Sequence, residues 1–353
     1  MVVAGAARSA RAQRRLKEHA AAQSLKYSPS SFTGTSPSAR GVRDMLEKLA
    51  GVPFSALVIT GETGTGKGLA ARILHHAGRR SEGPLVEVNC AAFPRDLLES
   101  ELFGHEAGAF TGAKALHRGL LEKADQGTLF LDEVSEMPLE LQVKLLKAIE
   151  DRSFRRLGGE REIRVEVTVI AATNRDIEAR VQEGSFRGDL YHRLSVFRLE
   201  LPPLRDRKED LEALVPMFIA EFNALAGKSV RLVSEETWKR LERHDWPGNV
   251  RELRNAVERS VLFAQTELLP DEWLQLRPGK PELPATPRVE GDWLSLPLDG
   301  SMPLDAMDRY IIKTALERNQ HNVTKAARAL GTTRETLRYR IQKYGLARTD
   351  GER

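Results

Sequence analysis

The sequence predicts an α/β protein, with a parallel sheet covered by helices, then a helical subdomain, then a separate all-α module. Over residues 41–275, short apolar runs alternate with helical patterns, which is typical of a parallel sheet buried between helices. After about residue 205 the strand-like runs stop and amphipathic helical patterns continue alone. A segment with six prolines and little periodicity, 277–303, then precedes a last helical pattern.

These changes divide the chain into five segments. We expect a disordered basic tail at 1–32, an α/β core at 33–205, a helical lid at 206–275, a proline-rich linker at 276–303 and a helical module at 304–353. The expected strands of the core are 56–60, 85–88, 128–131 and 165–171, and a helix is expected at 67–77. The expected helices of the lid are 210–225, 234–243 and 249–263.

Composition narrows the class of protein. Of the 353 residues, 41% are hydrophobic and 29% are charged, and no apolar run approaches the roughly 18 residues of a membrane span. No secretory signal is found, and the lone Cys90 allows no internal disulfide, so a cytoplasmic protein without a membrane partner is expected.

Basic charge gathers at the two ends of the chain. Residues 1–26 carry six basic side chains and one acidic one, and residues 301–353 carry eleven and six. The N-terminal charge fits either a disordered tail, which we favour, or an organelle transit peptide. The C-terminal charge fits a phosphate-binding surface or a solvated helical face, and charge alone does not decide between them.

A glycine-rich loop follows the first strand directly. Its residues are Gly61, Glu62, Thr63, Gly64, Thr65, Gly66, Lys67 and Gly68. Glycines at this spacing let backbone N–H groups surround a phosphate, and Lys67 adds a positive charge for the β- and γ-phosphates. The pattern normally ends in Ser or Thr, whose hydroxyl binds Mg²⁺, so Gly68 leaves that ligand missing.

Two carboxylates end the strand-like run TLFL. Asp132 and Glu133 follow it at the carboxyl end, where ligands of α/β sheets bind. Asp132 would hold Mg²⁺, directly or through water, and Glu133 would orient and deprotonate the attacking water. Together with the glycine-rich loop, this pair predicts hydrolysis of a nucleoside triphosphate.

The hexapeptide GAFTGA occupies residues 108–113. Small residues flank one aromatic side chain, Phe110, and one hydroxyl, Thr111. The glycines would let this loop swing, and an exposed Phe is costly in water but suits an apolar pocket of a partner. A glycine-rich surface turn with a buried Phe is the simpler alternative.

With these motifs the chain resembles the AAA+ ATPases and, among them, the sigma-54-dependent transcriptional activators, whose signature loop is GAFTGA. The resemblance covers about 33–275 and the C-terminal module. It implies an AAA+ core and lid that use ATP and Mg²⁺. It also implies that the signature loop contacts sigma-54 in the RNA polymerase holoenzyme through Gly108, Ala109, Phe110, Thr111, Gly112 and Ala113.

The same resemblance assigns further residues. Asn89 resembles the residue that holds the catalytic glutamate until ATP is sensed, and Asn174 resembles the sensor of the γ-phosphate. Arg187 and Arg193 resemble trans-acting arginines that reach a neighbouring subunit's ATP, which implies a ring, usually a hexamer. Arg251 resembles a second sensor that faces the phosphates. For any single arginine, a surface salt bridge is the simpler explanation.

Two features depart from the family's pattern. Gly68 stands where the family usually has Glu, so the start of the following helix is less certain. Only a short tail precedes residue 33, where many members carry a sensory domain, so control by a separate regulatory protein is expected.

The last segment predicts a helix-turn-helix that binds DNA. Ala326, Ala327 and Leu330 form a small apolar stripe, Gly331 makes the turn, and Thr332 or Thr333 caps the second helix. The side chains expected to contact DNA are Thr333, Arg334, Glu335, Arg338 and Arg340. Residues 305–318 resemble the pairing helix of a Fis-type dimer. A small helical bundle without DNA is the alternative.

Three functions compete at this stage. The leading one is a motor that binds enhancer DNA and remodels the sigma-54 RNA polymerase holoenzyme from the closed to the open complex. A second is an AAA+ chaperone or unfoldase, which would leave the helix-turn-helix unexplained. A third is a DNA-binding regulator that acts by occupancy, with a vestigial nucleotide site.

Overall fold

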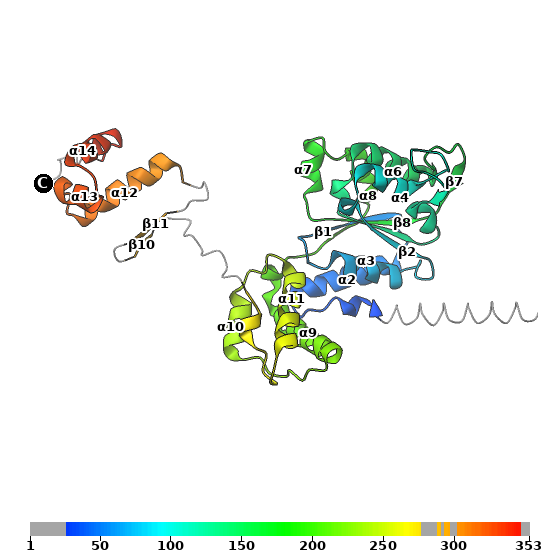
Figure 1. Cartoon of the computed structure of the whole chain (residues 1–353), viewed down its shortest axis with the longest axis horizontal. Coiled ribbons are helices and arrows are strands. Elements are labelled where there is room, and N and C mark those ends of the chain that lie inside the picture. Colours follow the sequence, from blue (N-terminus) through cyan, green and yellow to red (C-terminus); the bar gives the residue numbers. More distant parts are fainter. Residues whose placement is uncertain (1–25, 277–287, 291–292, 297–301, 347–353) are drawn as a thin grey trace, which may run out of the picture. The chain divides into compact units, whose positions relative to one another are not determined.

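The computed structural model describes residues 26–276, 288–290, 293–296 and 302–346 (Figure 1). The chain divides into two compact units, with the boundary between residues 276 and 277. The first contains the α/β core and the helical lid, and the second contains the C-terminal helices. In the described part of the chain, no helix is long and apolar enough to cross a membrane.

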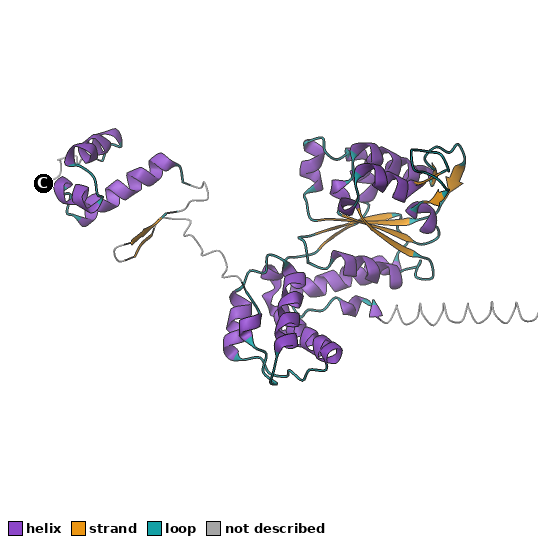
Figure 2. Ribbon diagram, in the orientation of Figure 1, coloured by secondary structure: helices purple, strands orange, loops and turns teal. Residues whose placement is uncertain are grey.

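The core contains a five-stranded parallel sheet in the order β2-β5-β8-β1-β9 (Figure 2). The strands are β1 (Ala56–Thr60), β2 (Leu85–Asn89), β5 (Thr128–Asp132), β8 (Thr168–Thr173) and β9 (Arg198–Glu200). The three central strands are rich in Val, Ile, Leu and Ala and buried on both faces, as a sheet covered on both sides requires. The predicted α/β fold is confirmed.

Alternate strand residues enter two separate cores. Leu57 and Ile59 pack with helices α2 (Pro37–Gly51) and α3 (Lys67–His76), whereas Ala56 and Val58 pack with the helices of the opposite face. These opposite helices are α4 (Arg95–Phe103), α5 (Leu120–Lys123), α6 (Leu139–Asp151), α7 (Ile177–Gln182) and α8 (Gly188–Leu194). Figure 1 shows the two layers on either side of the sheet.

Two small antiparallel pairs of strands lie outside the main sheet. They are β3 (Gly104–His105) with β4 (His117–Arg118), and β6 (Ser153–Arg155) with β7 (Glu162–Arg164). Short 3₁₀ turns complete the core at η1 (Pro29–Ser31), η2 (Cys90–Ala92) and η3 (Val134–Glu136). The β3–β4 pair closes the loop that carries the GAFTGA hexapeptide.

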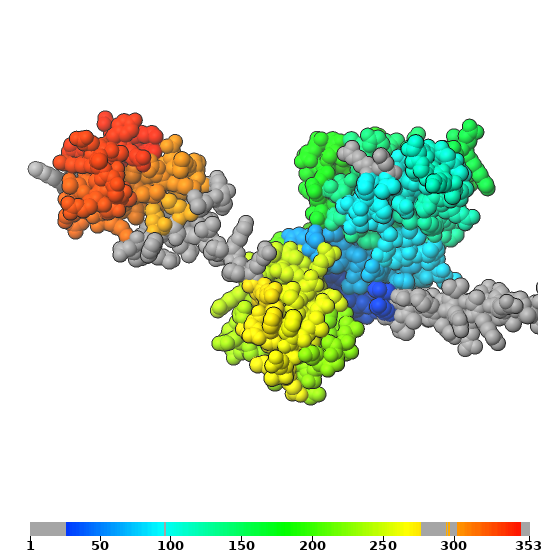
Figure 3. Space-filling view, in the orientation of Figure 1, coloured from blue at the N-terminus to red at the C-terminus, as the bar shows by residue number. Residues whose placement is uncertain are grey.

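The lid forms its own apolar core, which Trp246 fills at its centre. Its elements are η4 (Leu204–Asp210), α9 (Leu211–Ala226), α10 (Glu235–Arg243), α11 (Asn249–Phe263) and η5 (Asp271–Trp273). In the space-filling view of Figure 3, the lid, drawn green to yellow, lies directly against the blue N-terminal part of the core.

The second unit contains α12 (Leu304–Arg318), α13 (Val323–Ala329) and α14 (Arg334–Lys343). Ile312, Leu316 and Ala326 pack against Leu337 and Ile341 in one small core. Gly331 takes a positive φ of 61° between α13 and α14, and Thr333 caps α14 by accepting from the backbone N–H of Thr336 at 3.2 Å. The two helices therefore form the predicted helix-turn-helix.

Three expectations need correction. The predicted strand 165–171 begins only at Thr168. The predicted linker contains a short antiparallel pair, β10 (Arg288–Glu290) and β11 (Trp293–Ser295). Most of the predicted tail, 1–25, lies outside the described residues, but Phe32 is buried in the core of the first unit, with the Arg207 guanidinium 5.0 Å from its ring centre.

Candidate functional site

The glycine-rich loop after β1 depends on its glycines. Gly61, Gly64 and Gly66 have φ values of 149°, 85° and 109°, which favour glycine. A Cβ on Gly64 would lie 2.2 Å from the carbonyl oxygen of Gly248, so a side chain there would collide with the lid backbone. The loop is thus held tightly between the first strand and the lid.

Lys67 supplies a positive charge at the start of α3. Its Nζ donates to the carbonyl oxygens of Gly61 at 2.8 Å and Glu62 at 3.2 Å, and the residue is only 7% exposed. Burial lowers the pKa of Lys67, and the carboxylates of Glu133 and Asp132 oppose that shift. This amine is therefore poised to exchange its carbonyl partners for phosphate oxygens.

The two predicted carboxylates meet the loop at the end of β5. Glu133 has a positive φ of 52°, and its Oε2 accepts from the backbone N–H of Asn174 at 3.3 Å. The amide of Asn174 donates in turn to Thr63 Oγ1 at 2.9 Å. Asn174 thus connects the glycine-rich loop with the carboxylate expected to activate water.

A cavity of about 670 Å³ is lined by the glycine-rich loop, Lys67 and the two carboxylates, whereas Asn174 is not among its lining residues. It has the size that small ligands need. Its polar lining consists of the loop residues 63–68, Asn89, Asp132, Glu133, Arg207, Arg251 and Arg254 among others. Its apolar lining includes Phe32, Leu69, Phe130, Leu214, Met217, Phe218 and Val250. One part therefore suits phosphates and the other suits a planar base.

Sequence reasoning missed the apolar part of this cavity. Leu214 and Phe218 lie on α9, an apolar helix whose residues look like core of the lid, and Phe32 lay in a segment expected to be disordered. Of the predicted nucleotide-binding residues, Gly61 and Glu62 do not line the cavity. The side chain of Glu62 pairs with Arg205 instead, at 2.7 Å and 2.9 Å.

The lining fits Mg²⁺ bound jointly by protein and nucleotide. Asp132 faces the cavity, and among the described residues its Oδ1 accepts from the backbone N–H of Glu133 at 3.1 Å. Among the described residues, no cluster of three His, Cys, Asp or Glu side chains could hold a metal alone. The ion would therefore need phosphate and water oxygens beside Asp132, as Mg²⁺ sites with nucleotides commonly have.

Asn89 lines the same cavity at the end of β2. Its Oδ1 accepts from the backbone N–H of Ala91 at 2.9 Å and so caps the η2 turn that leads to α4. Within the described residues, Asn89 and Glu133 form no hydrogen bond, and Glu133 is held by Asn174 instead.

Neither predicted trans-acting arginine lines this cavity. Arg187 directly precedes α8 at its N-cap, is exposed, and donates to Asp189 at 3.0 Å and 2.6 Å. Arg193, near the other end of α8, lines a separate cavity of about 250 Å³ beside the amino ends of β1 and β8. Neither side chain can serve its own nucleotide in this arrangement.

The two ends of the GAFTGA loop are held together by a hydrogen bond. Gly108 N–H donates to Ala113 O at 2.8 Å, and Gly108 and Gly112 take positive φ values of 85° and 110°. The Phe110 ring stands edge-on to His105 at 5.0 Å but remains 44% exposed. His105 stacks in turn on His117 across the β3–β4 pair, at 5.4 Å.

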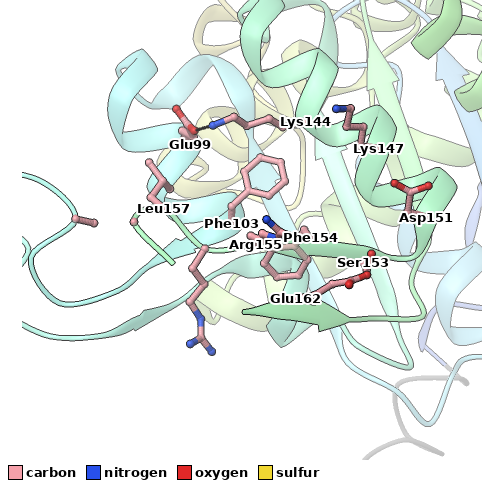
Figure 4. A pocket seen from close by; sticks show the side chains of 13 residues that line it. Glu99, Phe103, Lys144, Lys147, Asp151, Ser153, Phe154, Arg155, Leu157 and Glu162 are labelled. Carbon is pink, nitrogen blue, oxygen red and sulfur yellow. Dashed lines mark hydrogen bonds and ion pairs between the residues drawn. The ribbon is translucent and has the colours of Figure 1, made fainter. Parts of the chain in front are cut away.

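A second cavity, of about 640 Å³, lies beside this loop (Figure 4). Ala109 of the loop, Phe103 of α4 and Lys144 of α6 line it, together with residues of the β6–β7 hairpin. Figure 4 shows Lys144 paired with Glu99 across α6 and α4. The glycine-rich loop lines the first cavity and not this one, so the first cavity is the better candidate for a phosphate-bearing ligand.

In the second unit, the predicted DNA-contacting residues separate into two groups. Thr333, Arg334, Glu335 and Arg338 are exposed along α14 and its cap. Arg340 is exposed as well, but it donates to Asp308 of α12 at 2.6 Å. Tyr339, which sequence reasoning did not select, is 69% exposed beside Arg338.

Three protein families match successive parts of the chain. The sigma-54 interaction domain matches residues 32–200, the AAA+ ATPase lid domain matches 205–282, and the Fis family of bacterial regulatory proteins matches 303–344.

Several known proteins are similar to this chain over most of its length. Response regulator protein PilR of Pseudomonas aeruginosa is 40% identical over 89% of this chain and 69% of its own length. Regulatory protein AtoC of Escherichia coli is 43% identical over 84% of this chain, which spans only 64% of AtoC. The crystal structure of NtrX from Brucella abortus in complex with ATP is 32% identical, with a TM-score of 0.65, over 98% of this chain and 74% of that one.

Proposed function

Because this chain belongs to the bacterial regulators that join a sigma-54 interaction domain of the AAA+ class to a Fis-type helix-turn-helix, we propose that it is an ATP-driven activator of sigma-54-dependent transcription. In this proposal it binds enhancer DNA and converts the closed complex of the sigma-54 RNA polymerase holoenzyme to the open complex. The observation that carries it is one α/β core that bears both the GAFTGA loop and a cavity lined by Lys67, Asp132 and Glu133.

The hydrolytic step uses residues at the carboxyl edge of the sheet. The N–H groups of the glycine-rich loop and the amine of Lys67 bind phosphate oxygens, and Glu133 takes a proton from the attacking water. Asp132 would hold Mg²⁺, which would neutralise phosphate charge. Asn174 would link the γ-phosphate to Glu133, because its amide donates to Thr63, which lines the cavity, and its backbone N–H donates to Glu133.

Arg187 and Arg193 would act on the nucleotide of a neighbouring subunit. Arg187 is exposed, and its only ion pair among the described residues is a local one with Asp189, which a stronger phosphate partner can displace. This role requires a ring, which we propose to be a hexamer with the DNA-binding helices paired as dimers.

We propose that ATP hydrolysis is coupled to the signature loop through the chain segment that connects them. Asn89 lines the cavity, caps the η2 turn and leads into α4, and α4 runs directly into the β3 strand of the loop. A shift of Asn89 on nucleotide hydrolysis would therefore move α4 and release Phe110 from His105. The freed loop, residues 108–113, would then engage sigma-54.

The deciding experiment measures open-complex formation on a sigma-54 promoter with ATP. We compare the native chain with Thr111→Ala, in the exposed loop, and Lys67→Ala, in the cavity. Thr111→Ala should hydrolyse ATP but fail to open the promoter, and Lys67→Ala should fail at both. ATP hydrolysis without a response from any sigma-54 promoter would show a different client, and absence of hydrolysis would favour a regulator that acts by occupancy.

A further inference from the structure

Asn249 is buried where the lid meets the glycine-rich loop. It begins α11 with a positive φ of 53°, a conformation that costs free energy for residues other than glycine but that Asn tolerates best. Its Oδ1 accepts from the backbone N–H of Leu204 at 2.7 Å. Its Nδ2 donates to Glu62 Oε2 at 3.1 Å and to the carbonyl oxygen of Thr63 at 3.0 Å.

Glu62 receives a second partner from the same side. Arg205 donates to both of its carboxylate oxygens, at 2.9 Å and 2.7 Å, which is the strong bidentate geometry of an arginine–carboxylate pair. These bonds, with that of Asn249, lower the pKa of Glu62, so the carboxylate stays charged. The second residue of the glycine-rich loop is therefore tied to the lid by three hydrogen bonds.

A backbone hydrogen bond between the lid and the glycine-rich loop lies closer to the cavity. Arg251 N–H donates to Gly64 O at 3.3 Å, two residues after Asn249. Arg251 lines the nucleotide cavity, whereas Glu62, Arg205 and Asn249 do not. These three residues can therefore affect the nucleotide only through the loop and through Arg251.

We propose that Asn249, Glu62 and Arg205 form a loop–lid latch that positions Arg251 against the phosphates of the bound nucleotide. The latch rests on the proposed ATP hydrolysis, and its members are positioning residues. Segments 143 residues or more apart in sequence meet here, so the latch makes the relative position of core and lid a determinant of nucleotide affinity.

The sharpest variant is Asn249→Asp. It keeps the Oδ1 acceptor for Leu204 but removes the donor to Glu62 and Thr63, and it places two carboxylates together. With the full-length chain, we expect the Kd for a fluorescent ATP analogue and the KM for ATP to rise about tenfold, with kcat changed by less than about threefold. A merely structural role would lower the active fraction, and so the apparent kcat, at constant KM.

Two combinations test the assignment further. Adding Glu62→Gln to Asn249→Asp restores one hydrogen bond with donor and acceptor exchanged, and should recover part of the affinity. Adding Arg251→Ala should give no further loss, because residues that act through one another are not additive. Asp271→Asn, in the exposed pair with Arg240 of the lid, is the matched control and should leave Kd unchanged.

If Asn249→Asp fails to fold, Arg205→Gln breaks the latch from an exposed position and takes its place. Suppose that the native chain binds and hydrolyses ATP and that the variants keep Kd and KM within about twofold of the native values. This result would overturn the latch but not the proposed function. A native chain that binds no ATP would overturn the proposed function and the latch with it.

Discussion

Arg156 and Glu106 form an ion pair at 2.7 Å that joins the β6–β7 hairpin to the base of the signature loop. The same guanidinium donates to Glu122 of α5 at 2.7 Å and 3.2 Å. The Arg156 side chain is only 12% exposed, so solvent screens these bonds less than it screens most surface pairs. Arg156 thus holds the base of the signature loop through Glu106 and binds α5 through Glu122.

Loss of the Arg156 ion pairs should impair promoter opening but not ATP hydrolysis. Arg156→Ala removes the shared partner of Glu106 and Glu122, although Glu122 keeps Arg118 at 3.3 Å; the loss should cost roughly 1–3 kcal/mol of folding free energy and leave the GAFTGA loop badly positioned. We expect ATPase activity near native and open-complex formation reduced at least about tenfold. Arg155→Ala, an exposed neighbour on the same hairpin, is the control, and an equal loss in both variants would refute the role of Arg156.

Gly68 should be replaceable with a gain in stability. It lies in the first turn of α3, and a Cβ added there would have Phe130 Cε1 as its nearest neighbour, at 4.0 Å. Gly68→Ala therefore reduces the freedom of the unfolded chain without a collision, and should raise the free energy of unfolding by about 0.5–1 kcal/mol. Urea denaturation measures this change, and a lower midpoint for the variant would show that the loop needs glycine here.

His75 should make the fold sensitive to acid. Burial, assisted by His76, lowers its pKa to about 4, and its Nδ1 lies 2.9 Å from Thr128 Oγ1. The unfolded chain takes up this proton near pH ~6.5, so stability present above that pH is lost as the pH falls toward 4, by roughly 2–3 kcal/mol.

The variant His75→Asn tests this dependence, because its amide can keep a hydrogen bond to Thr128 without titrating. The difference between the urea midpoints at about pH 7.5 and about pH 4.5 should be smaller for the variant than for the native chain. The same pH dependence in both chains would assign the effect to other groups.

The two arginines of α14 should behave differently toward DNA. Arg338 is exposed, whereas Arg340 is paired with Asp308. Arg338→Ala should weaken binding to a random-sequence duplex about tenfold, and should reduce the salt dependence of binding if it contacts a phosphate. Arg340→Ala should change DNA affinity less than about twofold and cost at most ~1 kcal/mol of stability.

Fluorescence anisotropy at several salt concentrations measures the first effect, and thermal unfolding measures the second. Equal losses of DNA affinity in both variants would mean that Arg340 leaves Asp308 when DNA binds. Equal affinity in all three chains would remove α14 from the DNA interface.

Much of the nucleotide site could be predicted from the sequence, because its signals are local. The spacing of Gly61, Gly66 and Lys67 after an apolar strand reflects backbone geometry within a few residues. The apolar part of the cavity could not be predicted. In the sequence, nothing distinguishes Phe218 on α9 and Phe32 before α2, which line the cavity, from ordinary core residues.

The sequence by itself determined the α/β core, the glycine-rich loop, the carboxylates of Asp132 and Glu133, and the helix-turn-helix. Only the tertiary structure decided the partners of the charged side chains, such as Glu62 with Arg205 and Arg340 with Asp308. The physical reason is that strand period, glycine conformation and helix capping act over a few neighbouring residues. An ion pair depends on which distant segments the fold brings within about 4 Å of each other, and a charged residue in a sequence does not specify its partner.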